Sequence, residues 1–275
     1  MAVLLALMSS VLWGTSDFFG GLLSRRRAAY AVVGASQAAG LVAVTIVAVF
    51  TGGFGEPLGW VAPSILAAVT GSLGLVCFYA ALATGTMGVV SPIAALGAVV
   101  PVIGGLLAGE EPSKLAAAGI VLALFGAVAA SGPELQGRAG AKPVLLAALA
   151  GIGFGLAILF IARGAETDTV MTMWGMRLTS TLGFATAGLV TRSIGGLTPK
   201  DVGPIAVIGV GDVSANLLFG FSSQLGYVSV TAVLASLYPV TTVLLARAVL
   251  NERLLRIQYA GVAAALAGVA LVSIA

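Results

Sequence analysis

Residues 109–131 read GEEPSKLAAAGIVLALFGAVAAS, and residues 251–273 read NERLLRIQYAGVAAALAGVALVS. The second residue of each stretch is a glutamate, and each closes on a serine after an apolar run that contains two glycines. The matching positions are Glu110 and Glu252, Gly119 and Gly261, Gly126 and Gly268, and Ser131 and Ser273, all separated by 142 residues. Such a repeated apolar run predicts a duplicated, membrane-spanning unit.

The same duplication is visible at the front of each half. Leu4-Leu5-Ala6 with Trp13-Gly14 matches Leu145-Leu146-Ala147 with Phe154-Gly155, and Gly34 matches Gly175, here at a separation of 141 residues. One single-residue gap reconciles the two separations, so the repeat extends over the whole chain.

The composition identifies a bilayer as the environment of this protein. Of its 275 residues, 59% are hydrophobic and 8% are charged, whereas soluble domains have about 45–50% and about 25%. Polar breaks divide the chain into apolar stretches of roughly 20 residues, the length that crosses a membrane. Ten spans are predicted: 3–23, 29–50, 60–83, 87–108, 114–131, 143–163, 169–190, 203–224, 229–250 and 255–274. The sequence therefore predicts an all-α, multi-pass integral protein of the cell membrane.

Five spans fall in each half, and an odd number places the second half in the membrane with the opposite orientation. We therefore expect two inverted five-helix repeats, 1–132 and 143–275, joined by a linker over 133–142. Glu110 and Glu252 are expected to cap the spans that follow them, with gating as the alternative.

Several functional classes are disfavoured by residues that the chain lacks. It has no histidine and one cysteine, Cys77, so neither a structural zinc site nor a Ser-His-Asp triad can be assembled. No GxxxxGK[ST] phosphate loop is present. The net charge of +3 is spread over short loops, which argues against a nucleic-acid partner. We expect no metal, no cofactor and no enzymatic activity.

Four short motifs resemble those of the EamA-like permeases of the drug/metabolite transporter superfamily. They are Trp13-Gly14, Gly109-Glu110, Asn251-Glu252 and Tyr238-Pro239. The resemblance covers essentially the whole chain, and it implies a secondary transporter with a central cavity, commonly an exporter of amino acids or other small metabolites. Such permeases often carry an arginine in the second helix of each repeat. Here only the second half has one, Arg177, and the first half has Ser36 and Gln37 in the aligned region.

Three ionisable residues lie inside predicted spans: Asp17, Arg177 and Asp212. Each unpaired charge costs about 2.5–3.5 kcal/mol in the middle of a membrane, so such residues face protein or water and mark functional sites. At 1.5 Å of rise per residue, all three fall within roughly 10 Å of depth near the midplane. Neighbouring polar and aromatic positions complete the candidate site for substrate or coupling ion: Trp13, Gln37, Asn216 and Tyr238.

The charged residues leave two interpretations open. They could form a structural ion pair that never meets a solute, or they could bind substrate and protons. In the second case we expect Arg177 to pair with Asp17 and Asp212 to carry the proton.

Three prolines are predicted as hinges: Pro92 and Pro101 in the fourth span and Pro239 in the ninth. Each removes a backbone hydrogen bond from its helix, which lowers the cost of bending there.

The expected function is export of amino acids or related compounds by alternating access, with proton coupling as a further expectation. An uptake permease or a facilitative exchanger of the same fold is the alternative. A channel is disfavoured because isolated acids make a poor pore ring, and an intramembrane enzyme would have only carboxylates for its chemistry. The expected partners are a small-molecule substrate, the lipid bilayer and protons.

The orientation of the chain is predicted differently by two arguments. Loops on one side carry nine Lys and Arg residues and loops on the other carry two. The positive-inside rule then places both termini outside, whereas the family resemblance implies that they are cytoplasmic.

Overall fold

A computed structural model describes residues 1–84, 90, 93–131, 141–250 and 256–273 of the chain. Across these residues every regular element is a helix, which confirms the predicted all-α class. The first half contains α1 (Ala2–Ser24), α2 (Ala29–Thr51), α3 (Val61–Thr84), α5 (Val99–Leu107) and α6 (Lys114–Ser131). The second contains α7 (Ala141–Ala165), α8 (Thr169–Thr191), α9 (Val202–Leu225), α10 (Val228–Ala235), α11 (Tyr238–Leu250) and α12 (Arg256–Ser273).

Five segments are long and apolar enough to cross a membrane by length and composition. They are Ala2–Ser24, Ala29–Thr51, Leu58–Thr84, Ala141–Ala165 and Pro199–Leu225. Shorter apolar helices follow within Ile93–Leu107, Lys114–Gly126, Val228–Thr242 and Tyr259–Gly268. The chain is therefore a multi-pass membrane protein.

The helices differ from the predicted spans in three places. The predicted span 229–250 is two helices, α10 and α11, that are separated at Ser236 and Leu237. Part of the span 87–108 lies outside the described residues, and its described end is a 3₁₀ turn, η3 (Leu96–Ala98), followed by α5. α7 begins at Ala141, so the last two residues of the predicted linker are helical.

Local sequence explains where several helices begin and end. The Asp168 carboxylate accepts a hydrogen bond from the backbone N–H of Met171 and caps the start of α8, as expected for an acidic N-cap. α2 ends where Gly52 adopts a φ of +72°, a left-handed conformation that glycine reaches without strain.

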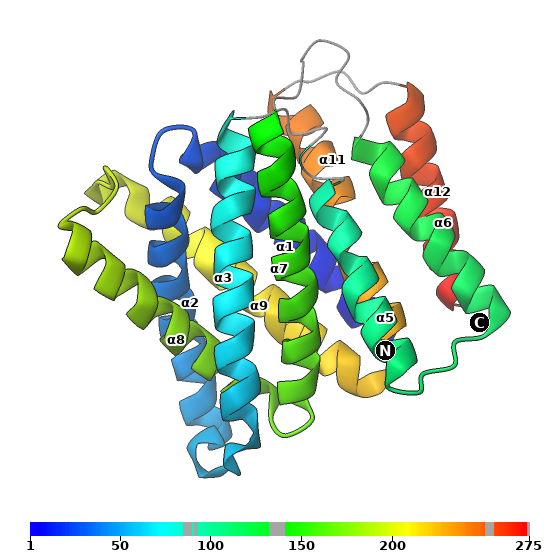
Figure 1. The fold of residues 1–275 in the computed structure, drawn as a ribbon, viewed down its shortest axis with the longest axis horizontal. Helices are drawn as coiled ribbons and strands as arrows, with labels where there is room; N and C mark the ends of the chain where they lie inside the picture. Colours follow the sequence, from blue (N-terminus) through cyan, green and yellow to red (C-terminus); the bar gives the residue numbers. More distant parts are fainter. Residues whose placement is uncertain (85–89, 91–92, 132–140, 251–255, 274–275) are drawn as a thin grey trace.

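The main helix contacts between the two halves have counterparts formed by the equivalent helices of the opposite halves (Figure 1). α1 packs on α9, and α7 packs on α3 in the same way. α2 packs on both α8 and α9, and α3 correspondingly packs on α8. α6 and α12 lie side by side at one edge of the molecule and contact each other extensively.

Two glycine contacts between α6 and α12 are related in the same way, residue by residue. A side chain on Gly126 would overlap the backbone of Ala265, and one on Gly268 would overlap the backbone of Ala123. Residue 123 corresponds to 265 and residue 126 to 268, both at the separation of 142. The α6–α12 contact is thus reciprocal, with each glycine admitting the backbone of the other helix.

Candidate functional site

A cavity of about 80 Å³ lies between helices of both halves. All seven residues predicted for the substrate or coupling site line it: Trp13, Asp17, Gln37, Arg177, Asp212, Asn216 and Tyr238. Polar residues on membrane helices face protein or water, and this preference gathers side chains from five different helices around one space.

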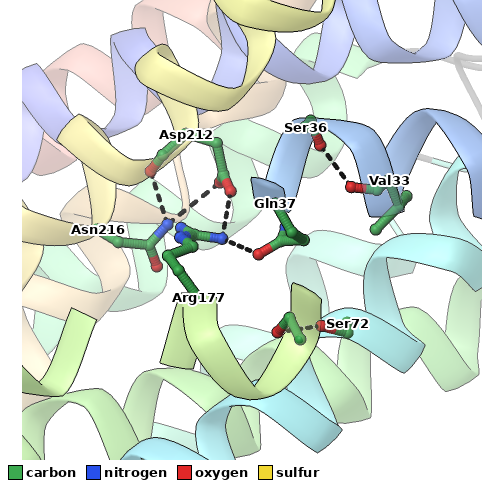
Figure 2. A network of polar contacts seen from close by, with 8 residues as sticks. Val33, Ser36, Gln37, Ser72, Arg177, Asp212 and Asn216 are labelled. Carbon is green, nitrogen blue, oxygen red and sulfur yellow. Dashed lines mark hydrogen bonds and ion pairs between the residues drawn. The ribbon is translucent and has the colours of Figure 1, made fainter. Parts of the chain in front are cut away.

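Arg177 of α8 is at the centre of the polar part of the cavity (Figure 2). Only 1% of this residue is exposed. Its Nη1 lies 2.9 Å from Oδ2 of Asp212, and the same nitrogen donates a hydrogen bond to Oε1 of Gln37. Because α8 packs on α2 and α9, the guanidinium reaches a partner on each of these helices.

Asp212 is held from a second side by Asn216, one turn further along α9. The Asn216 side-chain amide donates to Oδ1 of Asp212 at 3.1 Å and to the Asp212 backbone carbonyl at 2.7 Å. Residues four apart share a helix face, so this contact fixes the carboxylate against Arg177. Buried charges that are both paired and hydrogen-bonded are the ones that a low-dielectric interior tolerates.

Asp17 of α1 is 7% exposed and lines the same cavity without a cationic partner among the described residues. The Tyr79 hydroxyl and Asp212 both lie close enough to its carboxyl group to interact with it. The predicted pairing of Arg177 with Asp17 is therefore wrong, since Arg177 pairs with Asp212. Depth along the spans does not determine which helices are neighbours, and α9 is the acid-bearing helix on which α8 packs.

Tyr79 is a site residue that the sequence interpretation missed. It is 1% exposed, and its ring end occupies the space where Gly20 has no side chain. Gly20 lies one turn after Asp17 on α1, so the glycine makes room for the phenol beside the carboxylate. In the sequence, Gly20 signals that a side chain from another helix can approach Asp17. It does not show that this side chain is Tyr79.

The remaining wall of the cavity is largely apolar. Several of its residues occupy positions in one half that are equivalent to those of polar-wall residues in the other half. At a separation of 141 residues, Trp13 corresponds to Phe154, Asp17 to Ile158, Gly71 to Asp212 and Leu75 to Asn216, and all eight line the cavity. The two halves thus contribute equivalent positions with different side chains. Each lining acid in one half is matched by an uncharged residue in the other.

The interrupted helices also reach the cavity. Ser236 lies at the break between α10 and α11 and lines the space, as do the residues around η3 in the first half. Pro239 is the second residue of α11, and Pro101 is buried in α5 just after η3. Pro92 lies outside the described residues. The hinge assignment of these prolines remains a prediction.

Within the described segments, no three Cys, Asp or Glu side chains are grouped as metal ligands. The polar groups of the cavity are suited to ion pairing, hydrogen bonding and proton exchange.

Comparison with known proteins gives a family and a fold. The model of the EamA-like transporter family matches residues 1–132 and 141–274. Among solved structures, 28 chains match. One crystal structure has a TM-score of 0.80 at 18% identity, covering 99% of this chain and 96% of that one, a likeness that concerns the fold alone. No curated protein matches the chain.

Proposed function

The chain belongs to the EamA-like transporter family, and from this premise we propose that it is a secondary transporter that carries a small metabolite through the central cavity by alternating access. The observation that carries the proposal is the group of Asp17, Arg177 and Asp212 around one cavity between the halves. Ionisable groups are costly in a membrane and are retained where solutes or ions pass.

The proposed arrangement in the membrane is ten spans in two inverted five-helix repeats. Two observations support a two-fold relation between the halves. The α1–α9 contact is matched by the α7–α3 contact, and the glycine contacts of α6 and α12 are reciprocal. Inverted repeats give a transporter two related conformations, one open to each side, without a change in the fold of either half.

Asp17 is the proposed proton-binding residue. Asp212 is neutralised by Arg177 at 2.9 Å, whereas Asp17 has a phenol for a partner. A buried acid with no cation beside it is better suited to exchanging a proton than one held in an ion pair. This assignment replaces Asp212, which the sequence favoured as the proton carrier.

The proposed direction is export of amino acids or related compounds, as the family resemblance implies. Uptake or facilitated exchange uses the same cavity and remains the second candidate. The assay that follows separates gradient-driven transport from facilitated exchange.

Measuring solute flux in proteoliposomes, with and without an imposed pH gradient, tests the function. We expect the gradient to drive flux of one or more amino acids or related metabolites in the wild type. Asp17→Asn should abolish the gradient-driven part and leave exchange between identical solutes. Glu56→Gln changes an exposed acid away from the cavity and should have no effect.

Gradient-driven flux that survives Asp17→Asn would exclude proton coupling through this residue. Absence of flux for every amino acid and related metabolite, by a protein that remains folded, would contradict the transporter assignment of the cavity.

A further inference from the structure

Two of the polar contacts that join the halves lie at opposite ends of the bundle. One involves the turn between α1 and α2, and the other involves the connection between α5 and α6 (Figure 1). Neither contact touches the cavity residues described above, and each links one half directly to the other.

The first contact, here called the clasp, fastens the α1–α2 turn to the loop between α8 and α9. Nε of Arg27 lies 2.9 Å from Oδ2 of Asp201, and Nη2 of Arg27 donates to the Thr198 hydroxyl at 3.2 Å. The Ala28 backbone N–H donates to the Gly195 carbonyl at 3.1 Å. The Arg27 side chain is 27% exposed and that of Asp201 is 11% exposed, so water screens the ion pair only in part.

The second contact, here called the cap, places the carboxylate of Glu110 on the first residues of α10. Glu110 accepts hydrogen bonds from the backbone N–H groups of Val228 at 2.6 Å and Ser229 at 2.9 Å. The same carboxylate lies against Gly105 of α5, where any side chain would overlap it. Glu110 was expected to cap α6, the helix after it. It caps a helix of the opposite half instead, and Glu252 lies outside the described residues.

The cap acts on an element that reaches the cavity. α10 has only eight residues, and short helices depend strongly on what satisfies their ends. A carboxylate at the N-terminus supplies both hydrogen bonds and a favourable charge. Ser236, directly after the other end of α10, lines the cavity. Loss of the cap therefore frees a short helix whose far end leads directly to Ser236 in the cavity wall.

We propose that the clasp and the cap are the two gates of the cavity, and that they open in alternation. The clasp closes the end bearing the α1–α2 turn, and the cap closes the end bearing the α5–α6 connection. This inference rests on the proposed alternating access. Both contacts are formed together in this structure.

The test uses a reporter cysteine in the cavity and a reagent that cannot cross the membrane. The chain has a single cysteine, Cys77, so Cys77→Ser combined with Ser236→Cys provides one thiol at the cavity wall. A membrane-impermeant methanethiosulfonate is added to right-side-out and to inverted vesicles, and the rate of labelling is measured from each side.

Arg27→Gln should accelerate labelling from the clasp end, and Glu110→Ala should accelerate it from the cap end. Gly105→Ala should mimic Glu110→Ala, because the added methyl group displaces the carboxylate while leaving it in the chain. We expect about a tenfold faster rate from one side only, the factor that corresponds to 1.4 kcal/mol. Neighbouring charges provide matched controls: Arg26→Gln and Glu111→Gln remove exposed groups next to each gate and should change neither rate.

Equal acceleration from both sides, acceleration from the same side by both gate variants, or equal effects of the control variants would overturn the proposal. If Arg27→Gln does not fold, Arg27→Lys keeps the cation and loses the fork that reaches both Asp201 and Thr198. The readout requires no transported solute. Gates that respond as expected in a protein without flux would contradict the proposed transport and support alternating access to the cavity alone.

Discussion

At the scale of residues, the cavity contains an ion pair in which each member has one further side-chain partner. Arg177 is 1% exposed and uses one nitrogen for both Asp212 and Gln37, while Asp212 is also bonded by Asn216. Removing one partner of a buried pair leaves an uncompensated charge, which costs more than removing both.

The ion pair gives a prediction about stability. Arg177→Met should lower the free energy of unfolding by about 3–5 kcal/mol, because the Asp212 side chain, which is only 15% exposed, then loses its cationic partner. Adding Asp212→Asn should restore a large part of that loss. Denaturant or thermal unfolding in detergent measures both variants. A double variant as unstable as the single one would show that the pair is not the source of the cost.

Sequence reasoning identified the members of this site better than their pairing. Asp17, Arg177 and Asp212 stand out because charge is rare in apolar spans, and that physical cost is independent of neighbours. Pairing depends on which helices touch, which a single sequence does not provide. Tyr79 could not be distinguished from an ordinary packing aromatic, since nothing in its own span marks it as a partner of Asp17.

At the scale of elements, α6 and α12 form a contact in which each helix inserts its backbone beside a glycine of the other. Gly126 faces Ala265 and Gly268 faces Ala123. The overlap that a side chain would cause is with backbone atoms, so rotation of a side chain cannot relieve it.

The reciprocal contact predicts equal costs at two positions distant in sequence. Gly126→Ala and Gly268→Ala should each destabilise the protein by about 1–3 kcal/mol, the usual cost of overpacking. Gly183→Ala on α8 is the matched control, because a side chain there meets nothing within 4 Å, and it should be neutral or stabilising. Strongly unequal costs at the two glycines would contradict the two-fold relation of these helices.

Pro239 gives a second prediction at this scale. It is the second residue of α11, where the missing N–H has no helical partner in any case. Pro239→Ala should therefore change stability by less than about 1 kcal/mol, while slowing exchange in vesicles because the break before α11 becomes less sharply defined. Unchanged exchange would remove Pro239 from the hinges.

Helix limits were predicted well where charged or turn-forming residues interrupt an apolar run, as at both ends of α2 and α8. The division of the predicted span 229–250 into α10 and α11 was not foreseen. Residues 233–240 are apolar apart from Ser236 and Tyr238, so hydropathy is continuous across the break. Pro239, predicted as a hinge, is the local signal nearest to it.

At the scale of the whole molecule, charge is distributed unevenly between the two ends. The end with the clasp carries seven described cations: Arg25, Arg26, Arg27, Lys142, Arg192, Lys200 and Arg256. The other end carries Lys114 and Arg163, and its acids are Glu56, Glu110, Glu111, Glu166 and Asp168. Basic loops are retained on the cytoplasmic side during insertion.

This distribution predicts that the clasp end faces the cytoplasm. In a Cys77→Ser background, Glu56→Cys should react with an impermeant thiol reagent added to intact cells, and Lys200→Cys should react only after the membrane is opened. The opposite pattern would mean that the family expectation of cytoplasmic termini describes this chain and that the loop charges do not set its topology.

The reciprocal α6–α12 contact has a consequence for how such a chain could have arisen. A surface that is complementary to its own counterpart is isologous, and it can join two copies of one half as readily as two different halves. A dimer of the first half would retain the glycine contact and the helix pairs around it. It would carry two copies of Asp17 and none of Arg177 or Asp212. In a symmetric dimer of one half, any cationic residue in the cavity would occur twice, once in each copy. Fusion of the halves into one chain therefore allows the cavity to hold unlike charges on its two sides.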